Sequence, residues 1–143
     1  MLRRFAAVSA SAVLCLVGTA GAAEARTESL YAPSALVLSI SKGADAGSAV
    51  VQRAVTLSCA PTASGTHPAP EAACAELKAT HEGGTFGGLL ASPATDRMCP
   101  QHFDPVTVTV DGVWEGARTS WQYTFGNACT MGVTLNEGAA FSF

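Results

Sequence analysis

The sequence lacks the motifs that commonly identify a hydrolase or a nucleotide-binding enzyme. It has no Gly-x-Ser-x-Gly nucleophile turn, no His-Glu-x-x-His zinc helix, and no glycine-rich loop followed by Lys and Ser or Thr. The histidines His67, His81 and His102 stand in polar, Pro/Gly-rich or loop-like segments. We expect His67 to lie in a plain loop and His81 on the surface. An enzymatic function, and with it a cofactor, is therefore disfavoured.

Positive charge is also scarce. The chain has 8 basic and 11 acidic residues, for a formal net charge of −3. Arg53, Lys78, Arg97 and Arg118 are scattered and form no basic run. A protein that binds nucleic acid needs a clustered basic surface, so no nucleic-acid partner is expected.

Long apolar segments are absent after the first residues of the chain. Two arginines precede an apolar run from Phe5 to Gly18, and small residues follow as far as Ala25. This pattern predicts a secretory signal peptide over residues 1–25, which is cleaved, and a single extracellular domain over 26–143. A membrane anchor would need about 18 or more apolar residues, and this run is shorter and broken by two serines. No membrane contact is therefore expected after cleavage.

The cysteines include no Cys-x-x-Cys pair. Besides one cysteine in the signal run, the chain has Cys59, Cys74, Cys99 and Cys129, at gaps of 15, 25 and 30 positions. An even number in an exported chain predicts two disulfides, for which three pairings are possible. The sequential pairing closes the shortest loops, and each bond would contribute about 3–4 kcal/mol. Such gaps do not suit a metal site.

Alternating apolar residues predict several strands. The predicted strands are Tyr31–Ile40, Arg53–Cys59 and Pro105–Val110. Asp111-Gly112 is expected as a tight turn into a strand from Val113 to Phe125, and a short alternating piece follows at Ala140–Phe143. One helix is expected over Glu71–Ala79, with Pro70 in its first turn. The glycine-rich stretch 83–88 ends it. The fold class is therefore α+β, an antiparallel sheet covered on one face.

The stretch Met98–Pro105 is the most informative part of the sequence. It combines one cysteine and two prolines in a segment with no helical pattern. A disulfide at Cys99 would anchor it, and each proline fixes its own φ and favours extended geometry in the residue before it. A peptide stiffened in this way has already lost part of the entropy that binding costs. If Cys99 pairs with Cys129, Asn127 lies near the loop and can donate to its carbonyls.

At these residues the chain resembles the Streptomyces subtilisin inhibitors, a family of secreted proteins that block serine proteases. The resemblance covers nearly the whole mature chain. It rests on Tyr31-Ala-Pro-Ser-Ala-Leu-Val-Leu, Arg53-Ala-Val-Thr-Leu, Gly65-Thr-His-Pro-Ala-Pro, Met98-Cys-Pro, Phe103-Asp-Pro-Val and Val110-Asp-Gly-Val-Trp, in this order. Together these motifs are highly specific, whereas Cys-Pro alone would carry no weight.

The resemblance implies a fold and an assembly. It implies a five-stranded antiparallel sheet with two short helices on one face, and disulfides Cys59–Cys74 and Cys99–Cys129. It also implies a homodimer packed through sheet faces. Val37 holds the position that the family uses near that interface, and Trp114 and Met131 are weaker candidates for the same contact.

The resemblance also assigns roles within the loop. Gln101 takes P1, the residue whose side chain enters the primary pocket of a subtilisin-like serine protease, and His102 takes P1′, so that Gln101–His102 is the scissile bond. Cys99 takes P3 and Pro100 takes P2, and Asn127 matches an asparagine that braces the loop. The rest of the loop comprises Met98, Phe103 and Asp104. The protein itself supplies no catalytic residue.

The sequence departs from the family pattern at Gln101, where methionine or lysine is common. Glutamine offers neither the apolar reach of methionine nor the charge that suits a trypsin-like pocket. The stretch between Cys74 and Cys99 is also a few residues longer than the usual pattern. An alternative function is a secreted binding module, for instance a partner or substrate of a transglutaminase, for which an exposed Gln101 would serve.

Overall fold

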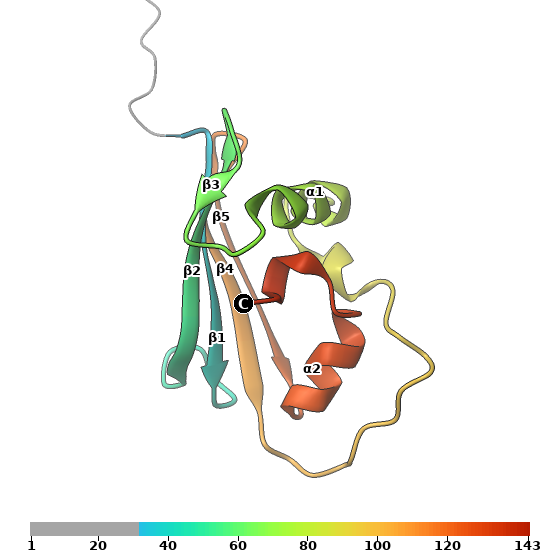
Figure 1. The fold of residues 1–143 in the computed structure, drawn as a ribbon. Helices are drawn as coiled ribbons and strands as arrows, with labels where there is room; N and C mark the ends of the chain where they lie inside the picture. Colours follow the sequence, from blue (N-terminus) through green and yellow to red (C-terminus); the bar gives the residue numbers. More distant parts are fainter. Residues whose placement is uncertain (1–31) are drawn as a thin grey trace, which may run out of the picture.

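The computed structural model describes residues 32–143, so the expected signal peptide and the start of the mature domain lie outside the described residues. The elements in chain order are β1 (Ser34–Lys42), β2 (Val50–Ala60), β3 (Ser64–Gly65), α1 (Pro70–Thr80), η1 (Gly87–Leu90), β4 (Val106–Trp114), β5 (Ala117–Phe125), α2 (Ala128–Thr134) and η2 (Ala139–Phe141). The five strands form one sheet in the order β3-β2-β1-β4-β5, with antiparallel neighbours. The helices lie on one side of this sheet (Figure 1). The predicted fold class is confirmed.

The alternation in β1 explains why the sheet has one covered and one open face. Leu36 and Leu38 are buried, whereas Val37 between them is 46% exposed. Leu36 pairs with Leu57 of β2, which is also buried. Successive side chains of a strand point to opposite faces, so one face joins the core and the other stays free of helices.

Helix α1 closes the core over the sheet. It begins at Pro70, whose missing N–H costs nothing at the first helical position. Its buried residues, Ala73 and Leu77, lie in one cluster with apolar side chains of the sheet and with Phe86 just before η1. The predicted helix is confirmed, with bounds about one residue wider at each end.

The expected turn at Asp111-Gly112 is wrong. Strand β4 continues through both residues, which pair with Val37 and Leu36 of β1, and the turn falls at Glu115-Gly116. A Cβ on Gly112 would stand 2.2 Å from the carbonyl oxygen of Ala35 in β1. The glycine is therefore needed for the close approach of two backbones, and not for a change of direction.

The expected strand at the C-terminus is also wrong. Residues 139–141 form η2, where Ala140 N–H donates to Glu76 Oε2 of α1 at 2.6 Å. His67 was expected in a plain loop, but it is 4% exposed. Its Nδ1 accepts from Ala69 N–H at 3.0 Å and its Nε2 lies 3.2 Å from the Ala140 carbonyl oxygen, so this side chain joins the loop before α1 to the C-terminal segment.

His81 does not behave as a free surface residue either. It is half-buried, and its ring lies 4.9 Å from the ring of Phe86 and 5.7 Å from that of Trp114, centroid to centroid. The three rings form an aromatic cluster in which Phe86 and Trp114 are core residues.

Candidate functional site

The long connection between η1 and β4 stands out from the domain (Figure 1, yellow to orange). Residues 91–105 contain neither a helix nor a strand. Gln101 and His102 are exposed, and the apolar side chains of Met98 and Phe103 are 97% and 76% exposed. Large apolar side chains held this far into solvent do not contribute to the core, so they are available for a partner.

The incoming limb of this loop, residues 94–100, is fastened to the segment around α2. Cys99 forms a disulfide with Cys129 in the first turn of α2, with a Cα–Cα distance of 5.7 Å. Ala94 N–H donates to the Val133 carbonyl oxygen at 2.8 Å. The other disulfide joins Cys59 to Cys74. Both pairings are those that the sequence resemblance implies.

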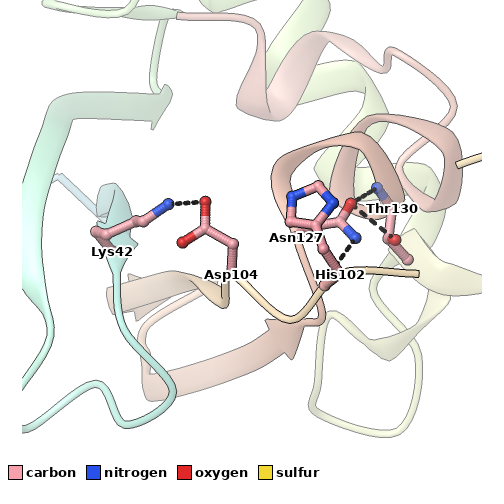
Figure 2. Close-up of polar contacts among 5 residues, drawn as sticks. All are labelled: Lys42, His102, Asp104, Asn127 and Thr130. Atoms are coloured by element: carbon pink, nitrogen blue, oxygen red, sulfur yellow. Dashed lines mark hydrogen bonds and ion pairs between the residues drawn. The ribbon is translucent and has the colours of Figure 1, made fainter. Parts of the chain in front are cut away.

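Asn127 braces the centre of the loop. Its side chain is buried at 3% exposure, and Nδ2 donates to the carbonyl oxygens of Pro100 and His102, each at 3.0 Å. Its Oδ1 accepts from Thr130 N–H at 2.9 Å, and Figure 2 shows the amide turned with one end to the loop and the other to the helix. Asn127 is thus also the N-cap of α2. The structure places it where the sequence predicts, in contact with the carbonyls on either side of Gln101.

The outgoing limb, residues 102–105, runs directly into β4 and carries no disulfide, and noncovalent contacts tie it to the sheet. Asp104 N–H donates to the Gly126 carbonyl oxygen at 2.8 Å, and Gly43 N–H donates to the Pro105 carbonyl oxygen at 2.9 Å. The Asp104 carboxylate forms an ion pair with Lys42 at the end of β1 (Figure 2). The sequence does not point to Lys42, because nothing local in it signals a contact 62 positions away. Gly126 contributes only its main-chain carbonyl, which any residue would supply.

The expected interface residues do not gather on one surface. Val37 lies on the open face of the sheet, but Trp114 is 5% exposed and packs edge-on against Phe86, with ring centroids 5.3 Å apart. Trp114 is therefore a core residue on the covered face and offers almost no surface to a second chain. Met131 of α2 is partly buried against the same core. Of the expected residues, Val37 alone presents its side chain on the open face.

The described residues contain neither a cluster of metal-ligating side chains nor a membrane-spanning helix. Within residues 32–143, no three His, Cys, Asp or Glu side chains come together as a metal ion would require. In the same part of the chain, no helix has the length and apolar character needed to cross a membrane.

Fold and loop together define a class of protein. A small disulfide-bonded domain that holds an exposed peptide from both sides is built to be bound as a substrate would be, which is how substrate-like protease inhibitors work. The family profile described as "Subtilisin inhibitor-like" matches residues 32–127. The chain belongs to this family, which confirms the expectation of an inhibitor rather than an enzyme.

Individual relatives support the same family assignment. The chain is 75% identical over 113 residues to subtilisin inhibitor-like protein 15 of Streptomyces bikiniensis, covering 79% of this chain and 100% of that protein. It is 48% identical over 145 residues to a subtilisin inhibitor of Streptomyces violaceus, covering 99% and 97% of the two chains. Among solved structures, Streptomyces caespitosus sermetstatin in complex with Bacillus licheniformis subtilisin superposes with a TM-score of 0.73 at 49% identity, covering 77% of this chain and 98% of that chain.

Proposed function

We propose that this chain inhibits subtilisin-like serine proteases through the loop Met98–Asp104, with Gln101 as P1 and Gln101–His102 as the scissile bond. The observation that carries the proposal is the double hydrogen bond from Asn127 Nδ2 to the carbonyl oxygens of Pro100 and His102. These carbonyls flank Gln101, so the brace holds the chain on both sides of the reactive residue. The sermetstatin–subtilisin complex supports the choice of protease class.

The mechanism follows from this geometry. The loop enters the protease cleft as an added strand, and main-chain hydrogen bonds supply much of the affinity. The serine of the protease attacks the Gln101 carbonyl carbon and expels the His102 amine. Because the loop is anchored on both sides, the amine stays close to the acyl group, and its return competes with attack by water. The protein is released slowly and mostly intact.

Titration against subtilisin tests the proposal. We expect activity to fall linearly with added protein up to one equivalent of binding sites, and Gln101→Pro to abolish the effect. Arg118→Gln is a matched control, since Arg118 lies on β5 next to the turn at the opposite end of β4 from the loop. Slow cleavage by subtilisin should create one new amino terminus, His102, seen by mass spectrometry. Unchanged protease activity at excess protein, together with transglutaminase-dependent labelling of Gln101, would support the alternative instead.

The identity of the target depends on Gln101. This side chain is exposed and makes no hydrogen bond within the described residues, so replacing it leaves the fold unchanged. We expect Gln101→Lys to gain inhibition of trypsin and Gln101→Met to strengthen inhibition of subtilisin. A panel of subtilisin, chymotrypsin, trypsin and a glutamate-specific protease measures both. Identical profiles for all three proteins would remove Gln101 from P1.

We also propose that the chain forms a homodimer through the open face of the sheet. On this face the Ser39 and Thr109 hydroxyl groups already pair with each other at 2.8 Å, so covering them leaves few unmet hydrogen bonds. Val37 supplies exposed apolar area beside them. Sedimentation velocity should show a dimer that Val37→Arg converts to monomers. Met98→Arg, the same kind of change on the loop, should remain dimeric.

Secretion is the last part of the proposal. The signal peptide 1–25 lies outside the described residues, so it rests on the sequence pattern. Expression of the full chain in a secreting bacterial host should yield a protein in the medium that begins near residue 26, as intact mass would show. Retention of the full-length chain in the cells would contradict it.

A further inference from the structure

The two limbs of the loop are fastened to different parts of the molecule. The incoming limb contacts the segment 127–137 through the Cys99–Cys129 disulfide, through the Ala94–Val133 hydrogen bond and through an ion pair between Arg97 and Glu137. The outgoing limb contacts the sheet at Gly126 just after β5, at Lys42, the last residue of β1, and at Gly43 just after it. Asn127 reaches both limbs.

This division matters once the Gln101–His102 bond is cut. The Gln101 acyl group, then an ester of the protease serine, remains on a limb that a disulfide holds two residues away. The His102 amine remains on residues 102–105, which are joined to the protein by the start of β4 and by noncovalent contacts. Resealing requires the amine to attack the ester carbonyl, so that the amide bond forms and the serine oxygen leaves and regains a proton. The position of the outgoing limb therefore controls resealing.

Lys42 is well placed to control the position of the outgoing limb. Its ammonium group forms an ion pair with Asp104, two residues from the new amine, while Thr107 Oγ1 fixes the neighbouring Gly43 carbonyl oxygen at 2.8 Å. Both charged side chains are close to half exposed, at 42% and 49%. An exposed pair adds little to the stability of a whole domain. After cleavage, however, the outgoing limb is a short free end, and the same ion pair removes much of the motion that this end retains.

We propose that Lys42 is a positioning residue of the inhibitory loop: its ion pair with Asp104 holds the amine-bearing limb after cleavage and so favours resealing over hydrolysis. This proposal rests on the proposed function. It assigns a role in the reaction to a residue at the end of β1, outside the loop itself.

The experiment compares single variants of the full secreted protein with equimolar subtilisin. Lys42→Met keeps the chain length and removes the charge, and Lys42→Arg restores it. Lys78→Met removes a charge from an exposed position on α1 and is the matched control. Three quantities are measured: the initial inhibition constant, the rate at which inhibition is lost as cleaved chain accumulates, and the melting temperature.

We expect Lys42→Met to hasten the loss of inhibition about two- to fivefold, the most that one exposed ion pair supplies. Asp104→Asn should do the same, and the double variant should add nothing further. Lys42→Arg and Lys78→Met should match the wild type, and all melting temperatures should agree within about 4 °C. Equal rates for Lys42→Met and wild type overturn the proposal, as does a loss confined to the initial inhibition constant. A wild type that never inhibits would instead remove the proposed function, and this role with it.

Discussion

Each of the two disulfides of this protein ties a segment to a helix, but the segments differ. Cys59–Cys74 connects strand β2 to helix α1, and both sulfurs pack against the core. Cys99–Cys129 connects an exposed loop to helix α2. The closed loops span 15 and 30 positions, for which chain-entropy estimates give about 3 and 3.6 kcal/mol. The bonds are thus nearly equal as restraints on the unfolded chain, and what separates them is the segment that each one holds.

Removing the second disulfide should have the largest effect on inhibition. In Cys99→Ala/Cys129→Ala the acyl-bearing limb loses its covalent anchor, so the two cut ends drift apart and water competes better. A restraint of about 3.6 kcal/mol corresponds to at most roughly 400-fold in the ratio of resealing to hydrolysis. Quantifying cleaved chain over time with equimolar subtilisin, at a temperature where the variant is folded, measures it. A cleavage rate like that of the wild type would show that the disulfide serves stability alone.

Removing the first disulfide should chiefly lower stability. We expect Cys59→Ala/Cys74→Ala to lose about 3 kcal/mol of unfolding free energy and roughly 10–20 °C in melting temperature. Because Cys59 and Cys74 do not touch the loop, the inhibition constant at 20 °C should stay within about twofold of the wild type. Calorimetry and titration on one preparation give both values. Weakened inhibition by a fully folded variant would mean that the two regions are coupled.

Asn127→Asp separates the two roles of the brace. Aspartate still accepts from Thr130 N–H and caps α2, so the melting temperature should fall by only a few degrees. It cannot donate to the carbonyl oxygens of Pro100 and His102, and its charge repels them. We expect cleavage of the loop by subtilisin to quicken about tenfold, since two hydrogen bonds are lost. Serine at this position is a neutral control that also caps without donating twice. Unchanged cleavage in both variants would contradict the bracing role.

The smallest effect should come from the incoming limb's own ion pair. Arg97 and Glu137 are at least half exposed, and the disulfide two residues later already holds this limb. We therefore expect Arg97→Gln to change the lifetime of inhibition by less than about twofold. Measured beside Lys42→Met, it compares a limb that a disulfide anchors with a limb that has none. A larger effect for Arg97→Gln than for Lys42→Met would reverse the assignment of the two limbs.

The sequence was informative where the physics is local. Alternation at Leu36, Val37 and Leu38 predicts both faces of β1, and Pro70 predicts the start of α1. It misled where a residue serves a distant neighbour. Gly112 resembles a turn residue, but a glycine is needed there because the backbone of β1 passes close to it. That strand lies about 75 positions earlier, so the residues around Gly112 do not reveal the contact.

The residues of the candidate site also divide into those that a local sequence pattern predicts and those that depend on a distant partner. The loop and its cysteines are visible as a pattern, and Asn127 becomes a candidate once the pairing of Cys99 with Cys129 is assumed. Lys42 could not be found, because its partner Asp104 is 62 positions away and each looks like an ordinary surface charge. His67 was misjudged for a related reason: its partner is a main-chain carbonyl at residue 140, which any sequence would supply.

The brace from Asn127 has one more consequence. Its hydrogen bonds to the loop go to main-chain oxygens, at Pro100 and His102, and to no side chain of the loop. Met98, Gln101 and Phe103 meanwhile point into solvent. The hydrogen bonds from Asn127 therefore do not depend on the identity of these three side chains. All three can be replaced without changing the residues that support the loop. Selection, in nature or in a display library, can then redirect such a protein to a new enzyme while the frame stays constant.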